Sequence, residues 1–178
     1  MNYLVISCSL NPNSRSRLLA QEAYQRLASI SESKTELLDL ADLPLPVCDG
    51  ADAYNNENAK LLKQRVVAAQ GILMACPIYN FDVSAAAKNV VELTGRDGWT
   101  GKVAGFLCSA GGQSSYMSVM QLANSLMLDF RTVIVPRFVY ANYPDFDDES
   151  VSSPEILKRI DELTQALVKL TSAVASFE

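Results

Sequence analysis

The sequence predicts an α/β fold in which one five-stranded parallel sheet is covered by helices on both faces. Three observations support this prediction. Apolar, β-favouring runs alternate with segments of helical periodicity along the whole chain. The apolar runs are continuous, as is typical of strands buried on both faces. The 178 residues suffice for one domain with a hydrophobic core and are few for two, so residues 1–178 are expected to form a single domain.

Each expected strand is a run of apolar, β-favouring residues. In chain order these runs are Tyr3–Cys8, Thr35–Leu40, Gly71–Cys76, Lys102–Cys108 and Thr132–Val139. Each expected helix shows helical periodicity; the first, for example, places Leu19, Ala23 and Leu27 on one face. In chain order the helices are Ser14–Ile30, Asn58–Gln70, Val83–Thr94, Ser115–Leu128 and Pro154–Phe177. The last helix begins with a proline, which suits a first turn, and follows an acidic segment, 142–153, expected at the surface.

Composition excludes several classes of function. The net charge of −5 argues against nucleic acid as a partner. The chain has no histidine, so it has neither a histidine-assisted nucleophile nor a histidine metal site. Its four cysteines lack the spacing of a zinc site, and no metal site is expected. Neither a signal peptide nor a membrane span is recognisable, so we expect a cytoplasmic protein without a membrane partner.

A parallel sheet of this kind commonly has the strand order 2-1-3-4-5, and that order predicts where a ligand binds. Strands 1 and 3 are neighbours that start connections in opposite directions, and ligands bind beyond the carboxyl ends of the strands at such a switch point. The turns after strands 1, 3 and 4 are therefore expected to line the site. They are also the three most unusual turns in the sequence.

The turn after strand 1, SLNPNSRSR, is rich in hydroxyl, amide and guanidinium groups and leads into a helix. Such a helix N-terminus, with its unpaired N–H groups, favours a phosphate group. The candidate ligands are Ser9, Asn11, Ser14, Arg15 and Ser16. An ordinary helix cap on a polar turn explains the same residues equally well. The glycine patterns of a nucleotide triphosphatase loop and of a dinucleotide-binding Rossmann turn are both missing.

The other two turns add an aromatic surface and a glycine pair. The turn after strand 3 contains Pro77, Ile78, Tyr79, Asn80 and Phe81. Its aromatic rings suit contact with a planar ligand, although aromatics more often fill the top of a core. The turn after strand 4 contains Ser109, Ala110, Gly111, Gly112 and Gln113. Two glycines permit close approach of a flat ring or a phosphate, and they also suit a flexible turn.

Taken together, the three turns favour a phosphorylated planar ring as the ligand, and flavin mononucleotide (FMN) meets that description. A bound cofactor also explains how an enzyme without histidine carries out its chemistry. Cys8, Cys76 and Cys108 each end an expected strand just below these turns. We interpret them as small buried apolar residues rather than as a redox or metal centre.

These residues resemble the NADPH-dependent FMN reductase family, which has the flavodoxin-like three-layer fold, over nearly the full chain. The most specific match is the family's proline-x-tyrosine-asparagine turn and the lysine-asparagine pair that follows it. Here these are Pro77, Tyr79, Asn80, Lys88 and Asn89. The first turn resembles the family's glycine-serine-leucine-arginine pattern with its later serine and asparagine. Its counterparts are Cys8, Ser9, Leu10, Asn11, Ser14 and Ser16.

The chain departs from the family pattern at three places. Asn11 stands where the family has arginine, and Ser16 stands where it has asparagine. Arg15 or Arg17 is a possible replacement for the missing phosphate partner. The proline-glycine pair that opens the family's third helix is Ser84-Ala85 here.

The resemblance implies an enzyme in which NADPH or NADH gives hydride to bound FMN. The reduced flavin then passes electrons to a small-molecule acceptor such as a quinone, an azo compound, a metal ion or free flavin. It further implies a homodimer or homotetramer, with Trp99, Tyr116 and Met117 as candidates for the contact surface. No side chain is expected to act as a catalytic acid or base.

Two alternatives remain open at this point. In the first, Cys8 is the nucleophile of a low-molecular-weight phosphatase or arsenate reductase. Six residues separate Cys8 from Arg15-Ser16, however, where that family's motif has five. In the second, the chain is a flavodoxin-type electron carrier, which fits the fold and the acidity but not the open, glycine-rich third turn.

Overall fold

The computed structural model describes residues 1–30 and 34–175 of the chain. Within them a seven-stranded sheet has the order β2-β1-β3-β5-β6, with β4 paired to β3 and β7 paired to β5. The strands are β1 (Asn2–Ser7), β2 (Lys34–Asp39), β3 (Gly71–Tyr79), β4 (Asp82–Val83), β5 (Val103–Ala110), β6 (Val133–Ile134) and β7 (Val139–Asn142). The α-helices are α1 (Arg15–Ile30), α2 (Glu57–Ala68), α3 (Ala85–Trp99), α4 (Met120–Phe130) and α5 (Pro154–Ala175).

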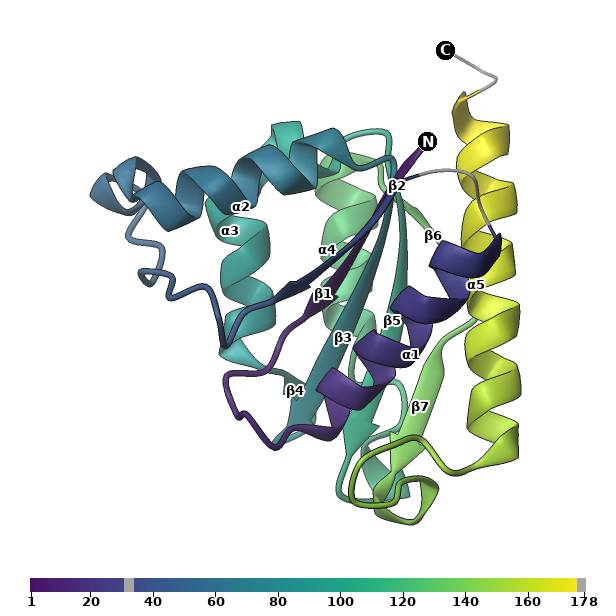
Figure 1. Ribbon diagram of the computed structural model, residues 1–178. Coiled ribbons are helices and arrows are strands. Elements are labelled where there is room, and N and C mark those ends of the chain that lie inside the picture. The colour runs from purple at the N-terminus through teal and green to yellow at the C-terminus, as the bar shows by residue number, and fades with distance from the viewer. Residues whose placement is uncertain (31–33, 176–178) are drawn as a thin grey trace.

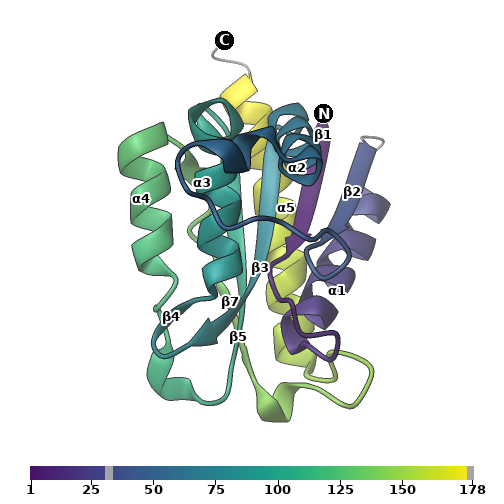
Figure 2. The ribbon, with the colours of Figure 1, turned by 90° about the vertical axis from the view of Figure 1, so that its left-hand side faces the viewer.

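Helices cover both faces of the sheet and form a three-layer arrangement (Figure 1). One hydrophobic core joins the sheet to α2, α3 and α4, and a second joins the opposite face to α1 and α5. The view turned by 90° shows β1, β3 and β5 between these layers (Figure 2). The predicted α/β class and the burial of the central strands on both faces are confirmed. The carboxyl ends of β1, β3 and β5 lie at one edge of the sheet, where the connecting turns meet.

The predicted count of five parallel strands is wrong at two places. The expected strand Thr132–Val139 is divided into β6 and β7, which both pair in parallel with β5. Pro136 lies in the gap, and a proline cannot donate a ladder hydrogen bond. In addition, β4 folds back on the end of β3 as an antiparallel hairpin, with Tyr79 opposite Asp82. The order of the long strands nevertheless places β1 and β3 side by side, as the switch-point argument requires.

Two helix boundaries also differ from the predictions, because residues with positive φ angles lie at them. Gly95, with φ of 60°, interrupts α3 where the expected helix ends, and one more turn follows it. The fourth helix begins at Met120 rather than at Ser115, because a 3₁₀ turn (Gln113–Ser115) and the left-handed residue Met117 precede it. The helix that begins at Pro154 is confirmed as far as Ala175, whereas residues 176 and 177 lie outside the described residues.

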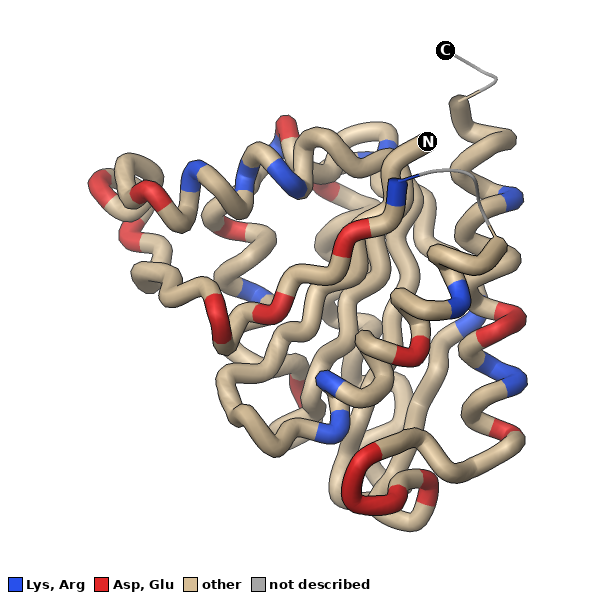
Figure 3. The backbone as a smooth tube through the Cα atoms, in the orientation of Figure 1, with Lys and Arg blue, Asp and Glu red and all other residues tan. Residues whose placement is uncertain are grey.

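Charged residues avoid the middle of the sheet (Figure 3). The strands β1, β3 and β5 contain no acidic or basic residue, whereas the edge strand β2, the helices and the loops carry charges of both signs. An acidic cluster lies in the segment between β7 and α5, which is mostly exposed as predicted. Among the described residues no helix is both long enough and apolar enough to span a membrane.

Candidate functional site

The turns after β1, β3 and β5 converge on one hollow of about 360 Å³ at the carboxyl edge of the sheet. We call it the switch-point hollow, because it lies where β1 and β3 meet. Its lining residues are Asn11, Asn13, Ser14, Arg15, Pro77, Ile78, Tyr79, Ser109, Ala110 and Gly111. Three segments that are far apart in sequence thus share one cavity.

The turn after β1 is held by side-chain hydrogen bonds between residues that are close in sequence. The Oγ of Ser9 accepts from the backbone N–H of Asn11 at 3.2 Å, and the Oδ1 of Asn11 accepts from that of Asn13 at 3.0 Å. The hydroxyls of Ser14 and Ser16 lie 2.7 Å apart, so one donates to the other and the second keeps its proton for another acceptor. Because α1 begins at Arg15, the N–H groups of Arg15 and Ser16 lack helical partners and favour an anion beside this turn, whereas the N–H of Arg17 donates to the carbonyl of Ser14 at 3.1 Å.

The two arginines of this turn have different surroundings. Arg17 is engaged by Asp39, with 2.7 Å between Nε and Oδ2. Arg15 lines the hollow, and its guanidinium carbon lies 4.1 Å from the centre of the Tyr143 ring. A cation over an aromatic face keeps its hydrogen-bond donors available. Arg15, not Arg17, is therefore the cation positioned to meet an anion in the hollow.

The turn after β3 is a tight hairpin that presents two aromatic rings to solvent. Its two central residues, Asn80 and Phe81, both have positive φ angles, 52° and 64°. Such a pair of angles is typical of a type I′ turn, which matches the twist of the adjoining strands. Tyr79 and Phe81 are 53% and 65% exposed, so they do not fill the top of the core. A bulky residue held in the left-handed region is strained, and such strain is concentrated at functional sites.

We expect Phe81→Gly to raise the free energy of unfolding by about 0.5–1 kcal/mol, because glycine adopts a positive φ without steric cost. Chemical denaturation of the flavin-free protein measures this change. Asn80→Gly is the matched control and should produce a smaller gain, since asparagine already tolerates the left-handed region. A loss of stability in Phe81→Gly would instead mean that the aromatic ring packs on the fold.

Two side chains fix the hairpin and the third helix against the rest of the site. The hydroxyl of Ser84 donates to the carbonyl of Cys8 at 2.8 Å and caps the N–H of Ala87 at 3.2 Å. It thus joins the start of α3 to the end of β1. The amide of Asn89 accepts from the N–H of Cys48 at 2.8 Å and donates to the carbonyl of Pro46 at 2.9 Å. Asn89 therefore holds the segment after β2 rather than lining the hollow.

The turn after β5 leaves room for a ligand. A Cβ atom added to Gly111 or Gly112 would meet no atom within 4 Å, and neither glycine has a positive φ. The fold itself therefore does not require glycine at these two positions. A ligand that approaches the backbone closely does require it. Tyr140 of β7 supports the turn from behind, since its hydroxyl donates to the carbonyl of Gly112 at 2.7 Å.

The residues predicted for the site divide into a lining group and a flanking group. Of the turn residues expected to bind a ligand, Ser9, Ser16, Asn80, Phe81, Gly112 and Gln113 do not line the hollow. Ser9 and Ser16 are buried in the first turn, whereas the other four lie at the hairpin tip and farther along the third turn. Asn13 lines the hollow but was not expected to. Its position inside the polar turn is the only signal that the sequence contains. The binding role of all these residues stays a prediction.

Three of the four cysteines, Cys8, Cys76 and Cys108, lie just before the turns that line the hollow, and their side chains are fully or almost fully buried. A hydrogen bond with Cys8, together with burial, holds the pKa of Cys76 well above its usual range. Burial likewise raises the pKa of Cys108. Cys8 has no exposed surface, and its thiol donates to the carbonyl of Ile6. Thiols in such places are packing residues, and the geometry does not favour Cys8 as a nucleophile.

The strand order and the helix layers define a flavodoxin-like α/β protein in which three turns at the carboxyl edge of the sheet share one hollow. Residues 1–145 match the family model described as NADPH-dependent FMN reductase, and the chain belongs to that family. It is thus an NAD(P)H-dependent oxidoreductase with FMN as its cofactor, as the sequence resemblance predicted.

Relatives and solved structures of similar fold agree with this assignment. An NAD(P)H-dependent FAD/FMN reductase from Geobacillus thermodenitrificans is 26% identical over 96% of this chain and 93% of its own length. An NADPH:quinone oxidoreductase from Arabidopsis thaliana is 28% identical over 80% of this chain and 75% of its own. The flavoenzyme NAD(P)H:(acceptor) oxidoreductase FerB from Paracoccus denitrificans has the same fold, with a TM-score of 0.75, 23% identity and 97% coverage of both chains.

One expectation about the contact surface is wrong. Trp99, a candidate for a subunit contact, has no exposed surface, and its Nε1 donates to Thr94 at 2.8 Å. It therefore belongs to the core beneath α3. Tyr116 and Met117 are 55% and 39% exposed and remain available for contacts.

Proposed function

We propose that this enzyme holds FMN in the switch-point hollow and passes electrons from NADPH or NADH to a small-molecule acceptor. Quinones, azo compounds, metal ions and free flavin are the proposed acceptors. The observation that supports this most directly is the convergence of a hydroxyl-rich turn, an aromatic hairpin and an open glycine turn on one cavity. When bound, FMN accepts hydride from the nicotinamide and returns electrons to the acceptor.

The chain's own residues supply binding and orientation. Ser14 and Arg15, which line the hollow at the start of α1, are proposed to hold the phosphate. The buried hydroxyl of Ser16, 2.7 Å from that of Ser14, is proposed to orient the Ser14 hydroxyl. Tyr79, which lines the hollow, is proposed to lie against the ring. Backbone N–H groups near Asn80 and Gly111 are proposed donors to its polar edge. Within the described part of the chain, Arg15 and Tyr79 are the only lining residues with titratable side chains, so no acid or base is assigned.

The glycine turn also favours an enzyme over an electron carrier. Exposed aromatic rings stand on the β3 side of the hollow, whereas Gly111 and Gly112 bring no side chain on the β5 side. A flavin bound there has one face open to a nicotinamide ring. A carrier of the flavodoxin type, by contrast, covers its flavin between bulky aromatics. Subunit contacts that build a homodimer or homotetramer, and a cytoplasmic location, stay predictions.

The visible absorption spectrum tests this function. Protein incubated with FMN and then freed of excess ligand should absorb near 450 nm, and addition of NADPH without oxygen should bleach that band. Protein carried through the same steps with riboflavin is the control for the phosphate, and it should retain less flavin. Failure to retain FMN, or retention without bleaching by either NADPH or NADH, would contradict the proposal.

A further inference from the structure

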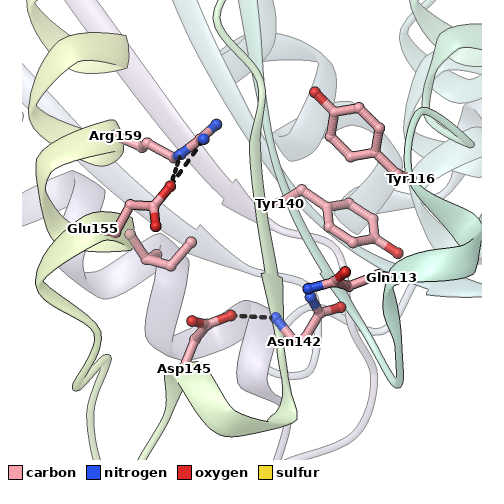
Figure 4. Close-up of a pocket in the computed structure, with 8 residues that line it drawn as sticks. Gln113, Tyr116, Tyr140, Asn142, Asp145, Glu155 and Arg159 are labelled. Atoms are coloured by element: carbon pink, nitrogen blue, oxygen red, sulfur yellow. Dashed lines mark hydrogen bonds and ion pairs between the residues drawn. The ribbon is translucent and has the colours of Figure 1, made fainter.

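A second hollow of about 430 Å³ lies between the segment that follows the glycine turn and the start of α5. We call it the α5 groove. It is lined by Gln113, Tyr116, Tyr140, Asn142, Asp145, Glu155, Ile156 and Arg159. Figure 4 shows Glu155 and Arg159 of α5 on one side, Tyr116 and Gln113 on the other, and Tyr140 and Asn142 of β7 between them. The groove begins at Gln113, only two residues beyond Gly111 of the switch-point hollow.

The aromatic and amide side chains of the α5 groove are groups that recognise a purine ring. Tyr116 and Tyr140 meet edge to face, with 5.3 Å between ring centres, and Tyr116 is more than half exposed. Exposed aromatic faces stack on nucleobases. Gln113 and Asn142 contribute side-chain amides, which suit the donors and acceptors along an adenine edge.

The α5 side of the groove carries a carboxylate and a guanidinium, which prefer different substituents on a ribose ring (Figure 4). Glu155 and Arg159 lie one helical turn apart, and the Nε and Nη2 of Arg159 lie 3.2 and 3.0 Å from one oxygen of Glu155. The nearby carboxylate of Asp145 already accepts from the N–H of Asn142 at 2.7 Å. A carboxylate accepts a hydrogen bond from the 2′-hydroxyl of NADH, whereas an arginine binds the 2′-phosphate of NADPH.

We propose that the α5 groove binds the adenosine half of the nicotinamide dinucleotide and that the Glu155–Arg159 pair sets the choice between NADH and NADPH. This inference rests on the proposed function, because the nicotinamide half must reach the switch-point hollow. The two hollows are separate cavities joined by one short turn, an arrangement that fits a two-part ligand. Arg159 is held by Glu155, so the carboxylate weakens binding of a 2′-phosphate both by competition and by repulsion.

The test uses FMN-loaded protein and two adenosine fragments, 5′-AMP and adenosine 2′,5′-bisphosphate, with affinities measured by calorimetry. Glu155→Gln should raise the affinity for the bisphosphate severalfold, and Arg159→Gln should lower it about tenfold, since a charge-assisted hydrogen bond is removed. Both substitutions should change the affinity for 5′-AMP less than they change the affinity for the bisphosphate. The ratio of kcat/KM for NADPH to that for NADH should shift in the same directions.

Arg96 and Asp129 form an exposed ion pair, 3.3 Å apart, that lies on α3 and α4 and does not line the groove. Arg96→Gln and Asp129→Asn should leave both fragment affinities unchanged. Failure of either fragment to bind at millimolar concentration, or equal effects of the two pairs of variants, would overturn the inference. If the protein retains FMN and NADPH bleaches it, but one of these two results is obtained, then only the assignment of the groove is refuted. Protein that fails the spectral test would refute the proposed function first.

Discussion

Replacement of Arg15 by glutamine is expected to lower the affinity for FMN by about ten- to a hundredfold and to leave the affinity for riboflavin nearly unchanged. Among the described residues Arg15 is the only cation that lines the switch-point hollow, and it stands at the start of α1 next to Ser14, which also lines it. A hydrogen bond between charged partners contributes about 1.5–3 kcal/mol, which corresponds to that range of affinity. Quenching of flavin fluorescence on titration with protein measures both dissociation constants.

Arg17→Gln is the matched control for this prediction. Arg17 is two residues away, but it is paired with Asp39 and, at 3.9 Å, with Asp42. Its loss should reduce stability slightly and change FMN affinity little. Equal losses for FMN and riboflavin in Arg15→Gln would show that Arg15 supports the ring site rather than the phosphate. An unchanged FMN affinity would remove Arg15 from the phosphate site altogether.

Much of the fold was predictable because its strongest signals are local. The central strands are continuous apolar runs without charge, and the helices between them have clear periodicity, so the α/β class followed directly. The errors occur where backbone conformation departs from the residue's usual preference. Phe81 and Met117 adopt positive φ angles that a sequence does not announce for bulky residues. One shapes the hairpin after β3, and the other delays the start of α4.

The location of the site was predictable to the level of segments but not of individual contacts. Strand order alone brings the turns after β1, β3 and β5 together, whatever their side chains. The sequence does not show that Arg15 rather than Arg17 is available to a ligand. The difference arises because Arg17 pairs with Asp39 and Arg15 lies over Tyr143, and both partners belong to other elements. Similarly, Asn89 matches the family pattern in sequence, yet its amide holds the backbone at Pro46 and Cys48. Pairings between distant segments decide these roles.

A glycine series separates the requirements of the ligand from those of the fold. Gly111→Ala is expected to weaken FMN binding about tenfold and Gly111→Val about a hundredfold, because the added atoms occupy the space beside the ring. Both variants should keep the free energy of unfolding of the flavin-free protein within about 0.5 kcal/mol, since no protein atom lies within 4 Å of the new Cβ. Fluorescence titration and chemical denaturation measure the two quantities.

Gly105→Ala should show the opposite pattern. Gly105 lies in the middle of β5, and its added Cβ would stand 2.8 Å from Leu73 and 2.9 Å from Leu163. Overpacking of this kind costs about 1–3 kcal/mol of stability, while FMN affinity should persist in the fraction that remains folded. If Gly111→Val instead destabilises the protein and binds FMN normally, then the third turn serves the fold, and the ring must lie elsewhere. The two glycines belong to one strand and its turn, so their contrast locates the boundary between the core and the cofactor site.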